Sequence, residues 1–290
     1  MDTELKRGTV VGDYRLETEV CVAGIHRLWL AENRTSGEAV ALKIPRRDRA
    51  SETVLEECIS RERQALDWIR TVGGHPNLMN LRESVSGDGE AILVVDPVDG
   101  DKLGEVVEWE SRLDTDEARD IGIDICDAMS FLHEREIVYR DIKPSNILLD
   151  SQQTPTIIDL TAATQSDRYD PSPSGGLSSR DHHPTWFVGG EFKPPEMFDD
   201  RPADPGPWST VYSLGKIILY LITAQKFSTH GLTPSDVEGT SPSYLDDIVE
   251  RATAADPAAR YSNPTALKHA LERKDPTPPQ TAKLSHVGGD

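Results

Sequence analysis

Residues 137–150, IVYRDIKPSNILLD, constrain this chain more than any other stretch. Apolar residues stand at both ends and polar residues in the middle, so we expect two short buried segments that hold a polar loop between them. The loop contains a carboxylate at Asp141, a cation at Lys143 and an amide at Asn146. A carboxylate can accept a hydroxyl proton, a lysine can steady a phosphate, and an amide oxygen can bind a metal ion. Phosphoryl transfer requires these functions.

Shorter motifs stand in order on both sides of this loop. Before it, Lys43 ends the run VALK of an apolar strand, and Glu62 lies in a segment with helical spacing. After it, residues 156–161 form a short apolar strand with Asp159 near its end, and the motifs FKPPE and DPAAR contain Glu196 and Arg260. A chance surface loop would not be accompanied by this set, so we interpret residues 137–150 as a functional loop.

The set resembles the motifs of the eukaryotic-like (Hanks-type) serine/threonine protein kinases over about residues 12–273. The catalytic loop of that family reads H-R-D-x-x-x-x-N, and Tyr139 stands here in place of the histidine. VALK resembles V-A-I-K, residues 159–161 resemble D-F-G, and FKPPE resembles A-P-E. A lysine two places after Asp141 favours serine and threonine over tyrosine as the acceptor.

The resemblance implies an α+β fold with two lobes, a small antiparallel β-rich N-lobe and a larger, mainly helical C-lobe. We place the N-lobe and its hinge in residues 1–98, the C-lobe in 99–274 and a proline-containing tail, expected to be disordered, in 275–290. Apolar runs at 10–11, 14–16, 28–30, 40–44 and 91–95 are typical of strands. Apolar residues at intervals of three and four predict helices over 51–72 and 115–134.

The resemblance also assigns roles to individual residues. Asp141 would accept the hydroxyl proton, Lys143 would steady the γ-phosphate, and Lys43, oriented by Glu62, would hold the α- and β-phosphates. Asn146 and Asp159 would bind Mg²⁺. The ATP-binding residues would be Val20, Leu28, Ala41, Lys43, Asp96, Val98 and Leu148, with Asp96 and Val98 acting through the hinge backbone. Arg260 would pair with Glu196 in a buried bridge.

Several positions depart from the family pattern. Cys21, Ala23 and His26 replace the three glycines of the phosphate loop, where glycine lets the backbone approach phosphates closely. Three further replacements are Thr161 for glycine, Gly189 for threonine and Thr210 for aspartate. They support an alternative, a pseudokinase that binds nucleotide or a partner. Because no catalytic side chain is missing, we favour an active but slow kinase.

The segment 165–190 is rich in Ser, Pro, Gly and Asp and is typical of a loop. By the resemblance it is an activation segment whose phosphate would be read by Arg140. The candidate acceptors are Ser172, Ser174, Ser178, Ser179 and Thr185. The expected partner is a protein with Ser or Thr hydroxyls, and self-phosphorylation or dimerisation stays open.

Composition limits the partners and the compartment. The 50 acidic and 31 basic residues give a formal net charge of −19, which disfavours nucleic acid and anionic membranes and suits concentrated salt. Three scattered cysteines predict neither a disulfide framework nor a metal cluster, and residues 1–7 lack the apolar core of a signal peptide. The longest apolar run, 217–222, is too short to span a bilayer. We therefore expect a cytoplasmic protein.

Overall fold

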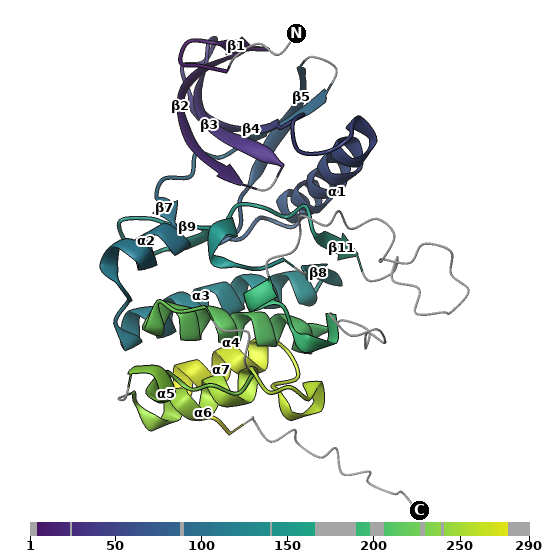
Figure 1. Ribbon diagram of the computed structural model, residues 1–290. Coiled ribbons are helices and arrows are strands. Elements are labelled where there is room, and N and C mark those ends of the chain that lie inside the picture. The colour runs from purple at the N-terminus through teal and green to yellow at the C-terminus, as the bar shows by residue number, and fades with distance from the viewer. Residues whose placement is uncertain are drawn as a thin grey trace, which may run out of the picture.

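The computed structural model describes residues 5–23, 25–87, 90–139, 141–165, 190–197, 206–226, 230–238 and 241–277. The expectations for Arg140, for most of the activation segment and for the tail beyond 277 lie outside these residues. A β-rich lobe carries the N-terminus and a helical lobe follows it (Figure 1). The predicted two-lobed α+β fold is confirmed. The boundaries at 98/99 and 274/275 stay predictions.

The smaller lobe is built on one antiparallel sheet in the order β1-β2-β3-β4-β6-β5. Its strands are β1 (Val10–Val11), β2 (Tyr14–Ala23), β3 (His26–Asn33), β4 (Ala39–Pro45), β5 (Leu81–Gly87) and β6 (Glu90–Val95). Alternate residues face opposite sides. Trp29, Leu42 and Val94 join a small outer cluster, whereas Leu28 and Ala41 join the large core that continues into the helical lobe. The inner face therefore adjoins the other lobe.

Helix α1 (Glu52–Thr71) covers the sheet beside β5 and β6 (Figure 1). Its buried stripe includes Leu55, Ile59, Leu66 and Ile69, the apolar periodicity from which the helix was predicted. Glu62 lies on this stripe and is fully buried. A carboxylate seldom stays buried without a charged partner, so its position on the apolar face indicates one nearby.

The larger lobe contains α2 (Leu103–Glu110), α3 (Thr115–His133), α4 (Pro207–Thr223), α5 (Pro234–Glu238), α6 (Ser243–Ala252) and α7 (Pro264–Arg273). Asp114 and Glu117 form a capping box that begins α3. Residues 209–223 of α4 are all buried, which makes α4 the central helix of the lobe. It packs against α3, α6 and α7.

Short strands flank the loops that lie between the two lobes. They are β7 (Asp101–Lys102), β8 (Ile137–Tyr139), β9 (Ile147–Leu149), β10 (Pro155–Ile157) and β11 (Ala163–Gln165). Strand β9 lies between β10 and β7, and β8 pairs with β11. Gly100 has φ +123°, and a Cβ there would lie 2.4 Å from the Leu149 carbonyl oxygen, so this close crossing requires glycine. The Lys102 ammonium donates to the Val22 carbonyl at 2.7 Å, which joins the start of α2 to β2.

The strand predicted over 156–161 is wrong in its extent, since β10 ends at Ile157. The Ile158 N–H still donates to the Asn146 carbonyl, in line with the β9–β10 register, and beyond it the Thr161 N–H bonds back to the Asp159 carboxylate in a local turn. Helix α4 was expected from the apolar run that follows Trp208, and α6 from the apolar residues at 245, 248, 249 and 252. Strand β5 and helices α2, α5 and α7 were not predicted.

Candidate active site

The loop at 141–146 is held between β8 and β9, with the short 3-10 turn Pro144–Asn146 at its end. The Lys143 ammonium donates to Asp141 Oδ2 at 2.6 Å. The Asn146 amide donates to the Asp141 carbonyl at 3.0 Å and lies 3.4 Å from Oδ2. Tyr139 is buried, and its hydroxyl donates to the same carbonyl at 3.0 Å. The three polar residues predicted from the loop therefore form one hydrogen-bonded cluster, which the Tyr139 hydroxyl joins through its bonds with Asp141 and Asn146.

The electrostatics of Asp141 combine two opposing effects. Burial raises the pKa of its carboxyl above the usual range, and the charge and hydrogen bond of Lys143 work in the other direction. At neutral pH such a carboxylate is a stronger proton acceptor than a solvent-exposed one. That is the property required of a general base.

Lys43 and Glu62 form a buried ion pair. The Lys43 ammonium also donates to the Ile158 carbonyl at 2.8 Å, and Glu62 Oε1 accepts the Leu160 N–H at 2.8 Å. Burial raises the pKa of Glu62, while the charge of Lys43 opposes that rise. The pair thus joins β4, α1 and the backbone on both sides of Asp159, which brings together residues that lie up to 117 positions apart on the chain.

Asp159 is buried and directly follows the segment bonded to Asn146. Its Oδ1 accepts the Thr161 hydroxyl at 2.7 Å and the Thr161 N–H at 3.0 Å. Burial works to raise the pKa of Asp159, but Lys43 and the bonds from Thr161 outweigh it and hold that pKa below the usual range. The carboxyl is therefore ionised. Sequence reasoning treated Thr161 only as a lost glycine, although a hydroxyl two residues after an aspartate is a common local partner.

The residues predicted to sandwich adenine lie in one place. Leu28, Ala41 and Leu148 are buried members of the large core, and Val20 packs against it. Leu28 is the register partner of Lys43, and cross-strand partners share a face of the sheet. Val98 joins the same core at 8% exposure. These side chains offer an apolar surface next to the Lys43 ammonium.

Asp96 is placed differently from the others. Its carboxylate accepts Asn80 Nδ2 at 2.7 Å and Arg82 Nε at 2.6 Å, and its N–H donates to the Asn80 carbonyl at 3.0 Å. The Asp96 side chain therefore anchors the start of β5. The backbone carbonyl of Asp96 is the group that remains to accept a hydrogen bond from a nucleotide at the predicted hinge.

Three supporting contacts lie deeper in the large lobe. Arg260 donates to both oxygens of Glu196, at 2.8 and 2.9 Å, and this buried pair was predicted. The Ser209 hydroxyl also donates to Glu196, at 2.7 Å. Thr210, which replaces the family's aspartate, lies 3.2 Å from Nε2 of His133. The start of α4 is thus joined to the end of α3 by a neutral hydrogen bond.

His26 was interpreted as a poor substitute for glycine at the tip of a loop. Instead it is 1% exposed, and its Nδ1 lies 3.5 Å from Glu62 Oε2. The residue belongs to the inner face of the sheet, not to an open loop.

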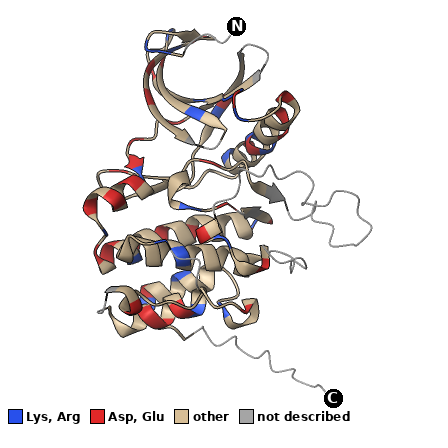
Figure 2. Cartoon of the chain, viewed as in Figure 1, with Lys and Arg blue, Asp and Glu red and all other residues tan. Residues whose placement is uncertain are grey.

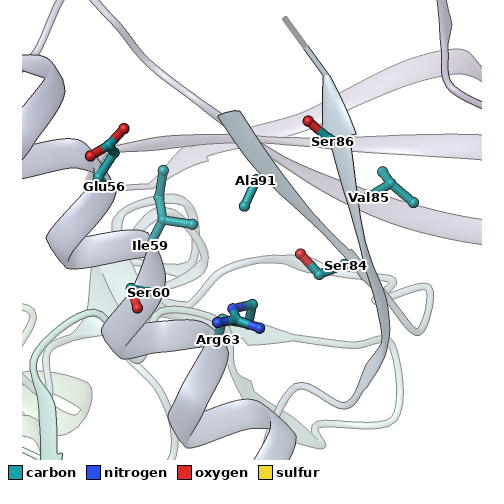
Figure 3. A pocket seen from close by; sticks show the side chains of 8 residues that line it. All are labelled: Glu56, Ile59, Ser60, Arg63, Ser84, Val85, Ser86 and Ala91. Atoms are coloured by element: carbon teal, nitrogen blue, oxygen red, sulfur yellow. The ribbon is translucent and has the colours of Figure 1, made fainter. Parts of the chain in front are cut away.

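A pocket of about 420 Å³ lies between α1 and strands β5 and β6 (Figure 3). Figure 3 shows side chains of α1 facing those of β5 and β6 across it. Its lining residues are Glu56, Ile59, Ser60, Arg63, Ser84, Val85, Ser86 and Ala91. None of the proposed catalytic residues is among them, so this pocket is separate from the cluster around Asp141.

Comparison with known proteins agrees with this geometry. Residues 27–271 match the model of the protein kinase domain. CBL-interacting protein kinase 11 of Oryza sativa subsp. japonica is 26% identical over 283 residues, which cover 92% of this chain and 53% of the relative. CBL-interacting serine/threonine-protein kinase 3 of Arabidopsis thaliana is 29% identical over 216 residues, 74% of this chain and 45% of the relative.

Fold, site and family model together define the class: the chain belongs to the protein kinase family. Its similarity to the rice and Arabidopsis kinases supports the serine/threonine branch of that family. The chain spans about half the length of those relatives. Within the described residues, no helix combines the length and the apolar character that crossing a membrane requires.

Proposed function

We propose that this chain transfers the γ-phosphate of ATP to serine and threonine hydroxyls of proteins. The observation that supports this most is the hydrogen-bonded cluster of Asp141, Lys143 and Asn146 beside the buried Lys43–Glu62 pair. It provides a base, two cations and, with Asp159, two oxygen ligands for a metal. Positioning and charge stabilisation carry most of the catalysis of phosphoryl transfer, and these residues serve both.

The residues present fit ATP and Mg²⁺. The Asn146 amide nitrogen is occupied by Tyr139 and Asp141, so the amide oxygen is the atom left for a cation. Asp159 is ionised, and both ligands are hard oxygens. Among the described residues, no cluster of three or more His, Cys, Asp or Glu could hold a metal. Mg²⁺ is commonly held by one or two side chains together with substrate phosphates. When bound, it would neutralise phosphate charge.

The proposed roles follow from position. Asp141 accepts the proton of the incoming hydroxyl, and Lys143, bonded to it, steadies the phosphate that is transferred. Lys43 holds phosphate oxygens and is kept in place by Glu62 and the Ile158 carbonyl. Leu28, Ala41 and Leu148 exclude water from the base of the nucleotide, which strengthens the charge interactions beside them.

The finer functional assignments belong to the same proposal. The substrate is a protein with Ser or Thr hydroxyls, and the chain itself is one candidate through segment 165–190. The relatives carry a CBL interaction in their names, and for this chain we propose the phosphotransfer step alone. Free cysteines at positions 21, 58 and 126 support a reducing, cytoplasmic compartment.

Transfer of labelled γ-phosphate tests the proposal. The wild-type protein, Asp141→Asn and Asp247→Asn are each incubated with ATP, Mg²⁺ and a generic protein substrate. Asp247 is exposed on α6, so its variant controls for the loss of one acidic charge. We expect incorporation into phosphoserine or phosphothreonine by the wild type and by Asp247→Asn, and a loss of at least about a hundredfold in Asp141→Asn.

If the chain is instead a pseudokinase, we expect a different result. All three proteins would bind ATP in calorimetry, and none would transfer phosphate, or all would give the same low incorporation. Either outcome, with folding verified by circular dichroism, would replace phosphotransfer by nucleotide binding as the function of this site.

A further inference from the structure

His26 occupies a fixed position at the first residue of β3. Its register partner on β4 is Pro45, and the Arg46 N–H donates to the neighbouring Ile25 carbonyl at 2.7 Å. Leu28, two residues on, is buried on the inner face, whereas the side chain of Arg27 between them is 39% exposed. The strand ladder therefore turns the imidazole of His26 inward, toward Lys43 and α1.

The imidazole faces Glu62 Oε2, the carboxylate oxygen that does not accept a hydrogen bond from Lys43. Glu62 Oε1 accepts from Lys43 and from the Leu160 N–H, whereas Oε2 lies 3.5 Å from His26 Nδ1. Among the described residues, neither imidazole nitrogen of His26 nor Glu62 Oε2 has a hydrogen-bond partner, and at 3.5 Å the two groups face each other without a formed hydrogen bond. A buried carboxylate oxygen is costly to leave unsatisfied, so this contact is the best available to both groups.

The charges nearby favour this contact. Burial, reinforced by Lys43, lowers the pKa of His26 to about 3, so the ring is neutral at physiological pH. A neutral imidazole carries one N–H, and the tautomer with that proton on Nδ1 presents a donor to Oε2. A histidine that only fills space in the core would not need to face a carboxylate.

We infer that His26 is a positioning residue for the Lys43–Glu62 pair, which it reaches from the start of β3. Its imidazole positions Glu62 through Oε2, so β3, α1 and the lysine of β4 are coupled. The inference rests on the proposed function only where it concerns phosphate binding. The contact itself exists whether or not the chain transfers phosphate.

A matched set of variants tests the contact. Asparagine in His26→Asn places an amide N–H close to the position of Nδ1, whereas His26→Leu keeps the volume and removes the donor. Arg27→Ala changes the exposed neighbour on the same strand. Hydrogen exchange of the Leu160 amide reports on Glu62 directly, because that N–H is bonded to Glu62 Oε1. We expect exchange about fivefold or more faster in His26→Leu, and close to wild type in His26→Asn and Arg27→Ala.

A double-mutant cycle with Glu62→Gln gives a second measurement, made on the folding equilibrium by urea titration. We expect His26→Leu to reduce the folding constant about fivefold less in the Glu62→Gln protein than in the wild type. Additive effects together with unchanged Leu160 exchange would overturn the inference. If the chain is an active kinase, the KM for ATP should rise in His26→Leu and recover in His26→Asn. If it is not, exchange and the cycle still decide.

Discussion

At Asp141, burial and a neighbouring charge have opposite effects on the pKa of the carboxyl. Burial raises the pKa of its carboxyl, and Lys143 limits that rise. Because a general base acts only when deprotonated, activity should fall as the pH drops through this pKa. The acid limb of the rate profile therefore reports on the contact between the two residues.

The variant Lys143→Ala should move that acid limb to higher pH, because the carboxyl loses the cation that stabilises its charged form. It should also lower kcat by about a hundredfold, since a preorganised donor near the phosphate is lost. Lys143→Arg keeps the charge and should leave the limb close to its original pH. The check is the pH dependence of kcat/KM for the three proteins. A limb that stays in place in Lys143→Ala would contradict the assignment of Asp141 as the base.

The buried ion pair between Arg260 and Glu196 affects the stability of the folded protein. Arg260 is fully buried and donates further bonds to the carbonyls of Ala254 and Trp208. Arg260→Ala should lower the free energy of unfolding by about 3–5 kcal/mol, because it leaves Glu196 buried and uncompensated. The double variant Arg260→Met, Glu196→Leu removes both charges and should be closer to wild type. Urea titrations measure both. Equal losses would show that the ion pair is not the source of the effect.

At the scale of elements, α4 and α6 approach closely at Gly215. A Cβ at Gly215 would lie 2.7 Å from the Ala252 Cβ and 2.9 Å from the Thr253 Cγ2. Both neighbours sit at the end of α6 and cannot swing away as a long side chain could. The close packing of these two helices therefore requires a residue without a side chain at position 215.

Gly215→Ala should lower the free energy of unfolding by about 1–3 kcal/mol despite the better helix propensity of alanine, because overpacking outweighs it. Gly104→Ala is the matched control, since its Cβ would meet Pro144 at 3.7 Å, an ordinary contact. That variant should be neutral or slightly stabilising. Thermal unfolding of both proteins decides, and a more stable Gly215→Ala would show that the two helices are free to separate.

The elements also show what the sequence could predict. Helices α1 and α3 and the order of the motif residues followed from periodicity and spacing, because those signals are local. The inward side chain of His26 did not. Strand β2 carries irregularities between Leu16 and Thr18 and between Glu19 and Cys21, and each such shift can change which residues of the hairpin face the core. Sequence alternation alone does not reveal them.

The partners of Asp96 and Asp159 were missed for a related reason. Asn80 and Arg82 reach Asp96 from the start of β5, a strand whose residues 81–87 contain too few apolar residues to be recognised. Asp159 was predicted as a metal ligand, but the part that Thr161 plays in fixing it depends on where the backbone leaves the strand. The Asp96 contacts pair side chains through tertiary structure, whereas the Thr161 contact is local and depends on the backbone turn after the strand.

At the scale of the whole molecule, charge is the dominant feature. The net charge is −19, and acidic positions are spread over α1, α2 and the helices at the far end of the larger lobe (Figure 2). Many acidic residues repel one another across both lobes, and that repulsion weakens as the ionic strength rises.

The melting temperature should therefore rise between low and molar KCl, although screening also weakens exposed pairs such as Arg7–Glu17. The buried Lys43–Glu62 and Arg260–Glu196 pairs are protected from salt and should hold throughout. Calorimetry over the salt series measures the trend. A flat or falling curve would mean that self-repulsion does not limit the stability of this protein.

The bond from Lys102 to the Val22 carbonyl has a kinetic consequence. It links the start of α2 to β2, the strand that also carries Val20, so we expect its loss to speed the release of a nucleotide from the proposed site. Lys102→Met should shorten the residence time of a fluorescent ATP analogue by about two- to fivefold, the contribution of one exposed charged hydrogen bond. Stopped-flow displacement measures this, with Lys102→Arg as the control. Unchanged dissociation in Lys102→Met would show that another step limits nucleotide release. Faster dissociation would mean that this lysine sets how quickly the site exchanges its nucleotide.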